Sequence, residues 1–230
     1  MTKRFETTAR ALGLLLALGT AACGGEEVRR RGSLDLAEAR EAAAVDLAEI
    51  GKRAPDFELE TITGTRVRLS DYQGKVVVLE WLNPLCPFTR AAHESSTLKD
   101  YPREVREEGV VWLGIDSAPE MKMGGAESDL RAAAESWGIE YPILLDRDGA
   151  IGRRFDATTT PAVFVIDERG VLRYVGAIDN RPFGKVRGGG EPQNYVADAI
   201  RQLRAGEPVE PSFRQSYGCR IKFAQTSLID

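Results

Sequence analysis

The stretch VVVLEWLNPLCPFTR, residues 76–90, decides the fold of this chain. Its first part, residues 76–81, is a mostly apolar run that is typical of a strand covered on both faces. A turn over residues 82–85 follows, and Pro87 suits the first position of a helix that starts at Cys86. A cysteine there lies near unpaired backbone N–H groups and the positive end of the helix dipole, and both favour the thiolate. The stretch therefore predicts a strand, a turn and a helix that present Cys86 as a nucleophile.

Composition and charge narrow the class of protein. The 230 residues have room for one good-sized domain with tails. The apolar fraction of 43% and the charged fraction of 29% are ordinary for a globular protein. The net charge is −4, and the short basic run 29–31 stands beside Glu26 and Glu27, as in a solvated linker. We therefore expect no nucleic-acid partner.

The first 22 residues are typical of an export signal. A positively charged segment precedes the apolar run 11–22, whose twelve residues are too few to span a bilayer comfortably. Small residues then lead into Cys23, an arrangement that resembles a bacterial lipoprotein signal, in which this cysteine is lipidated. We expect a membrane-anchored lipoprotein on the periplasmic side of the cell envelope. Ordinary cleavage after Ala22, which leaves Cys23 free, is the alternative.

The rest of the chain divides into three parts. Residues 23–50 are expected to form a tether and a helical spacer, residues 51–205 the folded domain, and residues 206–230 a tail that carries Cys219. An exported protein enters a compartment in which disulfides persist. If Cys23 carries lipid, Cys86 and Cys219 remain, and they could form one disulfide or act separately.

Hydrophobic periodicity and turn signals predict the other elements of the domain. Strands are expected at 57–61 and 65–69, joined as a hairpin, and at 110–115, 141–145, 162–166 and 171–177. Helices are expected at 87–108, with a break near residues 100–101 caused by Pro102, and at 126–137, 150–155 and 195–203. This order predicts a central mixed sheet with helices on both faces.

Five segments, taken in order, resemble a thioredoxin-fold redoxin of the group that holds alkyl hydroperoxide reductase/thiol-specific antioxidant and extracytoplasmic thioredoxin-like proteins. They are APDF at 54–57, LSDY at 69–72, GKVVVL at 74–79, WLNPLCPF at 81–88 and TTPAVFVIDERG at 159–170. The N-P-x-C-P-F site and the late Y-G-C at 217–219 further resemble one redoxin subgroup. The resemblance implies an α/β, thioredoxin-like fold with a central mixed sheet, flanking helices and an N-terminal hairpin.

The resemblance makes Cys86 the nucleophile and places Thr89 where thioredoxin has its second cysteine. Without a neighbouring thiol, a mixed disulfide at Cys86 would persist until another thiol attacked it. Three outcomes stay open: Cys219 resolves the mixed disulfide from a distance, an external thiol does so, or the site is not catalytic.

Four further residues are assigned by the same resemblance. Thr160 and Pro161 match the cis-proline loop, which lies against the active cysteine and offers backbone groups to a bound peptide. Pro87 and Phe88 are expected to line the substrate groove beside Cys86.

Glu80 precedes Cys86 by six residues, a spacing at which thioredoxin keeps a buried aspartate that assists proton transfer. A carboxylate inside an apolar strand suits general acid–base work near neutral pH. A partly exposed glutamate paired with Lys75 is the equal alternative.

No metal or cofactor is expected. His93, the single histidine, lies two helical turns and about 10 Å past Cys86, so we expect it on the helix surface. Asp146 and Asp148 beside Gly149 resemble the start of a calcium loop, but no acidic ligand follows at the required distance, so a turn is expected.

Together these features predict an enzyme: an extracytoplasmic thiol–disulfide oxidoreductase acting through Cys86 on protein or small-molecule thiols and disulfides. A thiol peroxidase acting on peroxides is the first alternative. In the peroxidatic P-x-x-x-T/S-x-x-C pattern, however, Leu79 stands here in place of the proline and Asn83 in place of the threonine or serine. A redox-inactive thioredoxin-like module that binds other proteins through the same groove is the second.

Overall fold

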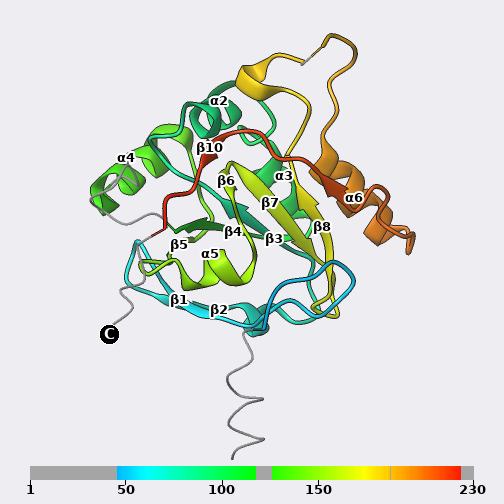
Figure 1. Cartoon of the computed structure of the whole chain (residues 1–230), viewed down its shortest axis with the longest axis horizontal. Helices are drawn as coiled ribbons and strands as arrows, with labels where there is room; N and C mark the ends of the chain where they lie inside the picture. Colours follow the sequence, from blue (N-terminus) through cyan, green and yellow to red (C-terminus); the bar gives the residue numbers. More distant parts are fainter. Residues whose placement is uncertain (1–45, 118–125, 187, 224–230) are drawn as a thin grey trace, which may run out of the picture. The chain divides into compact units, whose positions relative to one another are not determined.

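The computed structural model describes residues 46–117, 126–186 and 188–223 (Figure 1). The expected signal peptide and Cys23 lie outside these residues. Within the described part of the chain, no helix combines the length and apolar character needed to cross a membrane.

A mixed sheet forms the centre of the domain. In the described residues its eight strands run in the order β2-β1-β5-β4-β3-β7-β8-β9. β3 is parallel to β4 and antiparallel to β7. The strand that the sequence predicts just before Cys86 therefore lies in the middle of the sheet. The bounds are β1 Glu58–Thr61, β2 Arg66–Arg68, β3 Val77–Trp81, β4 Val111–Asp116, β5 Ile143–Leu145, β7 Ala162–Ile166, β8 Leu172–Gly176 and β9 Phe213–Arg214.

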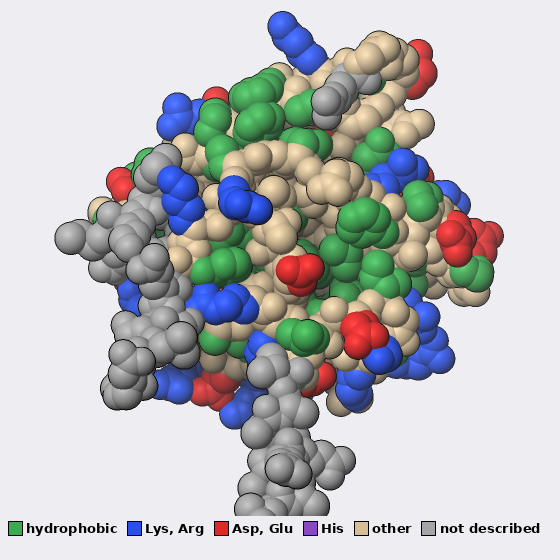
Figure 2. Space-filling model, in the orientation of Figure 1, with side chains coloured by type: hydrophobic (Ala, Val, Ile, Leu, Met, Phe, Trp, Pro, Cys, Tyr) green, Lys and Arg blue, Asp and Glu red, His purple; other side chains and the backbone are tan. Residues whose placement is uncertain are grey.

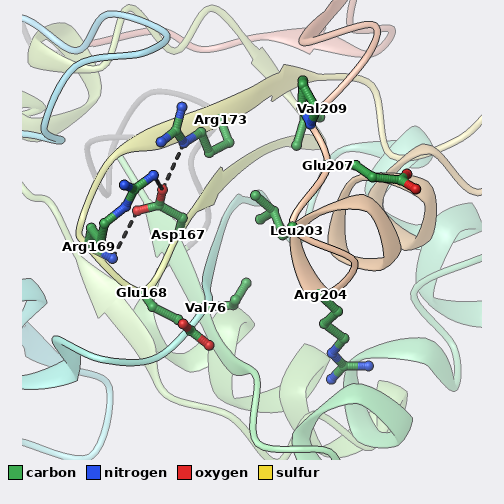
Figure 3. Close-up of a pocket in the computed structure, with 11 residues that line it drawn as sticks. Val76, Asp167, Glu168, Arg169, Arg173, Leu203, Arg204, Glu207 and Val209 are labelled. Atoms are coloured by element: carbon green, nitrogen blue, oxygen red, sulfur yellow. Dashed lines mark hydrogen bonds and ion pairs between the residues drawn. The ribbon is translucent and has the colours of Figure 1, made fainter.

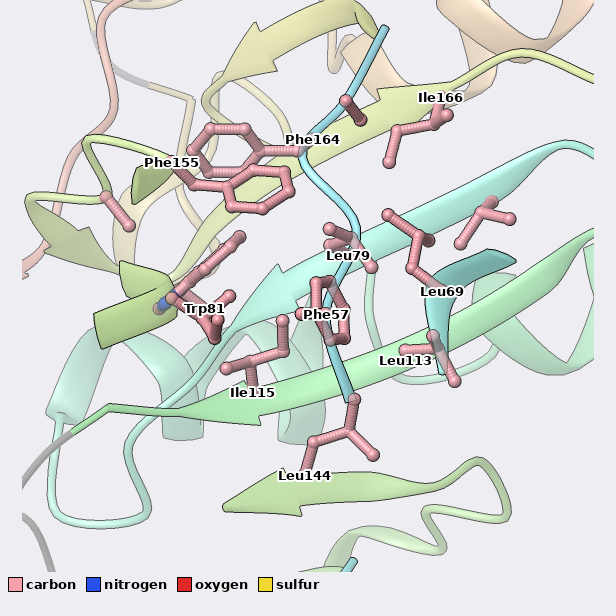
Figure 4. Close-up of a cluster of buried hydrophobic side chains, with 14 of the residues drawn as sticks. Phe57, Leu69, Leu79, Trp81, Leu113, Ile115, Leu144, Phe155, Phe164 and Ile166 are labelled. Atoms are coloured by element: carbon pink, nitrogen blue, oxygen red, sulfur yellow. The ribbon is translucent and has the colours of Figure 1, made fainter. Parts of the chain in front are cut away.

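Successive side chains of β3 point to opposite faces of the sheet, so the strand contributes to two hydrophobic cores, one on each face. Leu79 and Trp81 point to one core, where the Trp81 ring lies 5.4 Å from Phe155 and 4.7 Å from Phe164, measured between ring centroids (Figure 4). Val78 points to the other core. Because both faces are covered, every residue of β3 is buried, as its apolar run predicts.

Helices cover both faces of the sheet. The short helix α5 packs against the core that holds Trp81, whereas α2, α3 and α6 contribute to the core that holds Val78. The prediction of an α/β fold with a central mixed sheet, flanking helices and an N-terminal hairpin is confirmed. The helices are α2 Pro87–Ser95, α3 Tyr101–Glu107, α4 Glu127–Trp137, α5 Ala150–Arg154 and α6 Tyr195–Arg204, with short 3-10 helices at η1 Leu69–Tyr72 and η2 Pro182–Gly184.

The predicted break in the helix after Cys86 is confirmed near residues 100–101, where α3 begins, although the break starts several residues before Pro102. α2 ends at Ser95, and Pro102 lies in the first turn of α3, where a proline is tolerated. The hydroxyls of Ser96 and Thr97 donate instead to the distant Asp179, at 2.8 and 2.6 Å. The end of α2 therefore coincides with long-range hydrogen bonds to Asp179, and the position of Pro102 alone does not predict it.

The tail after α6 folds back on the domain, although its sequence predicts no strand. β9 extends the sheet in parallel with β8, and β10 (Cys219–Arg220) pairs antiparallel with β6 (Thr159–Thr160). Gly176 permits the first contact, because a Cβ there would lie 1.8 Å from the Arg214 carbonyl oxygen. We call residues 213–223 the C-terminal strap; Figure 1 shows it crossing from the β8 edge of the sheet to β6.

Candidate active site

Cys86 lies at the junction that the sequence predicts. It is the N-cap of α2, in an extended conformation, with Pro87 at the first helical turn. Asn83 shapes the preceding turn, since its side chain accepts from the Leu85 N–H at 2.8 Å and its carbonyl accepts from the Cys86 N–H at 3.1 Å. Only 2% of the Cys86 surface is exposed. The buried strand β3 and the turn at Asn83 together place Cys86 in the interior of the domain.

The Thr160–Pro161 loop lies directly against this sulfur. The peptide bond between the two residues is cis, as predicted. In its protonated form the Cys86 thiol donates to the Thr160 carbonyl oxygen at 3.1 Å. The loop therefore occupies the position beside Cys86 that the resemblance assigns to it.

The strap brings Cys219 to the same loop. In the β10–β6 ladder Cys219 stands opposite Thr160, and the Ile221 N–H donates to the Thr158 carbonyl at 2.9 Å. Gly218 makes this approach possible, because a Cβ there would lie 2.0 Å from the Thr160 carbonyl oxygen. Both Cys86 and Cys219 are free thiols in this structure. Two cysteines far apart in sequence therefore both lie against the Thr160–Pro161 loop.

The two thiols differ in their pKa values. Burial alone would raise the pKa of Cys86, but the Cys219 side chain, the Thr89 N–H and the nearby threonine hydroxyls stabilise the thiolate, and the pKa falls below its ordinary value. Burial and the neighbouring Cys86 raise the pKa of Cys219 to about 12. The pair therefore favours a Cys86 thiolate beside a Cys219 thiol, so Cys86 is the better nucleophile.

Thr89, which replaces the usual second cysteine, is fully buried in the first turn of α2. Within the described part of the chain, its hydroxyl has no hydrogen-bond partner. The same hydroxyl is among the groups that lower the pKa of Cys86. A buried hydroxyl normally finds a partner, and the Cys86 thiolate, whose pKa this hydroxyl lowers, is its candidate acceptor.

Thr89→Val should therefore raise the pKa of Cys86. Without the donated hydrogen bond, we expect Cys86 alkylation at pH 7 to slow about fivefold, or about 1 kcal/mol. Iodoacetamide labelling across a pH series, followed by peptide mass spectrometry, measures the change. Thr89→Ser should restore the original profile; an unchanged profile in Thr89→Val would contradict this role for the hydroxyl.

Glu80 is fully buried, so its alternative assignment as a partly exposed partner of Lys75 is wrong. One carboxylate oxygen contacts His93 Nε2 at 2.9 Å. The other accepts from Trp112 Nε1 at 2.9 Å and from the Tyr141 hydroxyl at 2.8 Å. A buried carboxylate requires such partners, since leaving it unpaired would be costly.

The prediction that His93 lies on the helix surface is also wrong. Only 2% of His93 is exposed, and its ring stacks on Trp137 with centroids 4.7 Å apart. The helix turns this residue toward the sheet, where Glu80 supplies its polar partner. An acidic residue inside an apolar strand was the signal that a buried partner must exist.

The expected groove residues lie at the start of α2. Pro87 is exposed, and the half-buried Phe88 ring packs 4.0 Å from the Phe183 ring and 6.1 Å from the Tyr217 ring, between centroids. Tyr217 in turn donates its hydroxyl proton to the buried Asp179, and burial followed by that carboxylate raises its pKa. No local pattern in the sequence marks Asp179, because its hydrogen bonds come from segments far apart in the chain.

Two other features lie away from Cys86. Asp146 does form the expected turn, and its buried carboxylate accepts from the N–H groups of Ile151 and Gly152 at the start of α5. A cavity of about 400 Å³ opens at the other end of β3, beside Val76, where Asp167 pairs with Arg173 at 2.8 Å (Figure 3).

In the described residues no cluster of acidic, histidine and cysteine side chains could hold a metal ion. On the face in Figure 2, basic and acidic side chains are interspersed.

A central mixed sheet, a cysteine at a strand–turn–helix junction and a cis-proline loop against its sulfur define a thioredoxin-like redox protein. A model of the AhpC/TSA family matches residues 50–175, more than half of the chain. The chain belongs to this family.

Known relatives represent two kinds of thiol chemistry. The chain is 30% identical over 127 residues to the thiol-disulfide oxidoreductase ResA of Geobacillus kaustophilus, a match that covers 55% of this chain and 68% of ResA. It is 26% identical over 161 residues to peroxiredoxin Bcp of Bacillus subtilis, covering 68% of this chain and 95% of Bcp. The crystal structure of the hypothetical protein SMc02350 from Sinorhizobium meliloti shares the fold, with a TM-score of 0.69, 22% identity and coverage of 77% of this chain and 96% of that one.

Proposed function

We propose that this protein is an extracytoplasmic thiol–disulfide oxidoreductase in which Cys86 attacks the substrate and Cys219 resolves the product. The observation that carries the proposal is the shared loop: Cys219 pairs with Thr160, whose carbonyl lies 3.1 Å from the Cys86 sulfur. The export signal predicted for residues 1–22 and the predicted lipidation of Cys23 support a membrane-anchored location outside the cytoplasm. The relationship to ResA supports disulfide exchange.

The pKa values set the order of the two steps. The Cys86 thiolate attacks a disulfide, forms a mixed disulfide and releases one substrate sulfur as a thiolate. Cys86 then carries no charge, so its contribution to the raised pKa of Cys219 is lost, although the effect of burial remains. Cys219 loses its proton and attacks the Cys86 sulfur, which releases the second substrate thiolate. A dithiol reductant returns the Cys86–Cys219 disulfide to two thiols.

In this proposal Glu80 acts by holding α2 in position. Its carboxylate contacts His93 on that helix, together with Trp112 and Tyr141 from neighbouring elements. Among the described residues, the hydrogen bonds of Glu80 do not include either cysteine. We therefore assign Glu80 a positioning role beneath the helix that begins at Cys86.

Cys219→Ser should stop the reaction after its first step. Treated with a small disulfide, the wild-type protein is expected to lose two thiols and form a Cys86–Cys219 bond, whereas the variant accumulates a mixed disulfide on Cys86. Mass spectrometry of proteolytic peptides distinguishes these products. A wild-type mixed disulfide that lasts as long as that of the variant would show that an external thiol resolves Cys86 instead.

Peroxide reduction through the same two cysteines is the second candidate. The Thr89 hydroxyl, which has no oxygen or nitrogen partner in the described residues, could donate to the oxygen of a Cys86 sulfenic acid. Cys86 would take one oxygen from the hydroperoxide and release an alcohol, and Cys219 would then displace water to form the disulfide. Parallel rates with hydrogen peroxide and a small disulfide decide between the candidates. If Cys86 reacts with neither, the redox-inactive binding module is the better interpretation.

A further inference from the structure

The C-terminal strap is built to stay over the active site. At one end β9 is paired with β8, and at the other the Phe223 ring packs against α5. Two glycines of the domain make room for that ring, because a Cβ on Gly149 or Gly152 would lie 2.5 Å from it. Between the two ends, the Tyr217 hydroxyl bonds to Asp179. The domain and the strap are thus shaped to each other at several separate points.

The docked strap takes the place at which an extended polypeptide would bind. Peptides that add to a sheet edge pair with its free backbone groups. Beside Cys86 that edge is β6, and β10 already pairs with Thr159 and Thr160. Because both residues of β6 are paired with β10, a second chain cannot add to this edge while the strap is docked.

The surface that remains next to Cys86 has a different character. Leu85 and Phe183 are 52% and 51% exposed, and both are near the start of α2. Their side chains can flank a small molecule, but they offer no paired backbone edge to a polypeptide.

We propose that the docked strap restricts Cys86 to low-molecular-weight disulfides and excludes disulfides carried by polypeptides. This inference rests on the proposed function and names its substrate class. Cys86 attacks one sulfur of a small disulfide RSSR, giving Cys86–S–S–R and RS⁻. Cys219 displaces the second RS⁻, and its proton passes to solvent. The small disulfide gains two electrons, and the cysteine pair supplies them.

The test isolates the first step in a Cys219→Ser background, so that neither substrate depends on resolution. The probes are hydroxyethyl disulfide and the disulfide-linked dimer of a short unstructured peptide, and mass spectrometry measures the rate of mixed-disulfide formation at Cys86. Gly218→Ala displaces the strap, because the new Cβ collides with the Thr160 carbonyl. Gly206→Ala is the matched control, since Gly206 also has a positive φ, of 70°, but nothing lies within 4 Å of an added Cβ.

In the Cys219→Ser parent, we expect the small disulfide to react at least about a hundredfold faster than the peptide disulfide. Gly218→Ala should raise the peptide rate by about tenfold while leaving the small-disulfide rate within about threefold, whereas Gly206→Ala should change neither rate. Faster hydrogen exchange at the Ile221 amide, with unchanged exchange in β3, would verify that only the strap has moved.

Equal reaction of the parent with both probes, or a peptide rate that does not rise when the strap is displaced, would overturn this inference. Failure of Cys86 to react with either probe would instead overturn the proposed function itself. The two failures are therefore distinguishable in one experiment.

Discussion

Cys86→Ser is expected to abolish disulfide exchange, with a fall in rate on the order of a thousandfold or more. The remaining Cys219 cannot replace it, because burial, the largest cause, together with Cys86 raises the pKa of Cys219 to about 12. Removing Cys86 relieves part of that effect, but the partial burial of Cys219 in β10 remains. Reduction of hydroxyethyl disulfide with a dithiol reductant measures the rate.

The pH dependence gives a second test of the same nucleophile. Because the pKa of Cys86 is lowered from its ordinary value of 9.0, the exchange rate should rise with pH and level off below pH 9.0. Cys219→Ser follows the first step alone. Its hydroxyl can replace the hydrogen bond by which the Cys219 side chain lowers the pKa of Cys86, so the rate should still level off below pH 9.0. A Cys86→Ser variant that folds normally and retains more than about a tenth of the rate would place the nucleophile elsewhere.

Glu80→Ala is expected to destabilise the domain by about 3–5 kcal/mol. The substitution leaves His93, Trp112 and Tyr141 as buried polar groups without their shared acceptor. Burial, together with the Glu80 carboxylate, raises the pKa of Tyr141 well above its ordinary value, which shows how closely the two groups face each other. Urea unfolding followed by circular dichroism measures the free energy of unfolding.

Two further variants sharpen this result. Glu140→Ala is the control, because the side chain of Glu140 is 62% exposed in its ion pair with Arg106 and should contribute less than about 1 kcal/mol. Glu80→Gln keeps a hydrogen-bond acceptor and should be less destabilising than Glu80→Ala. If Glu80→Gln remains stable but shifts the pH profile of Cys86, the carboxylate takes part in proton transfer; a loss below about 1 kcal/mol in Glu80→Ala would contradict the network.

Several elements were predictable because their signals are local. The apolar run ahead of Cys86 indicated a strand covered on both faces, and Pro87 marked the start of α2. The N-terminal hairpin and the antiparallel pair β7–β8 followed from short strands around turn residues. The cis bond before Pro161 was predicted from a motif, since single-sequence periodicity does not report peptide isomers.

The polar interior of the site was harder to predict. A helical period shows which residues share a face, but it does not say which face packs inward when few apolar residues mark it. Thus His93 was assigned to the surface, although α2 turns it toward Glu80. Asp179 likewise depends on Ser96, Thr97 and Tyr217, which reach it from separate segments.

By itself the sequence determined the strand–turn–helix that presents Cys86 and the absence of a second cysteine at Thr89, because both depend on neighbouring residues. Only the tertiary structure decided which thiol lies on the Thr160–Pro161 loop beside Cys86. The pairing of β10 with β6 joins residues about sixty apart in sequence, and it depends on Gly218 fitting against the Thr160 carbonyl. Such a contact leaves no periodic signal in the chain, since it depends on close approach between two backbones and not on a pattern along either one.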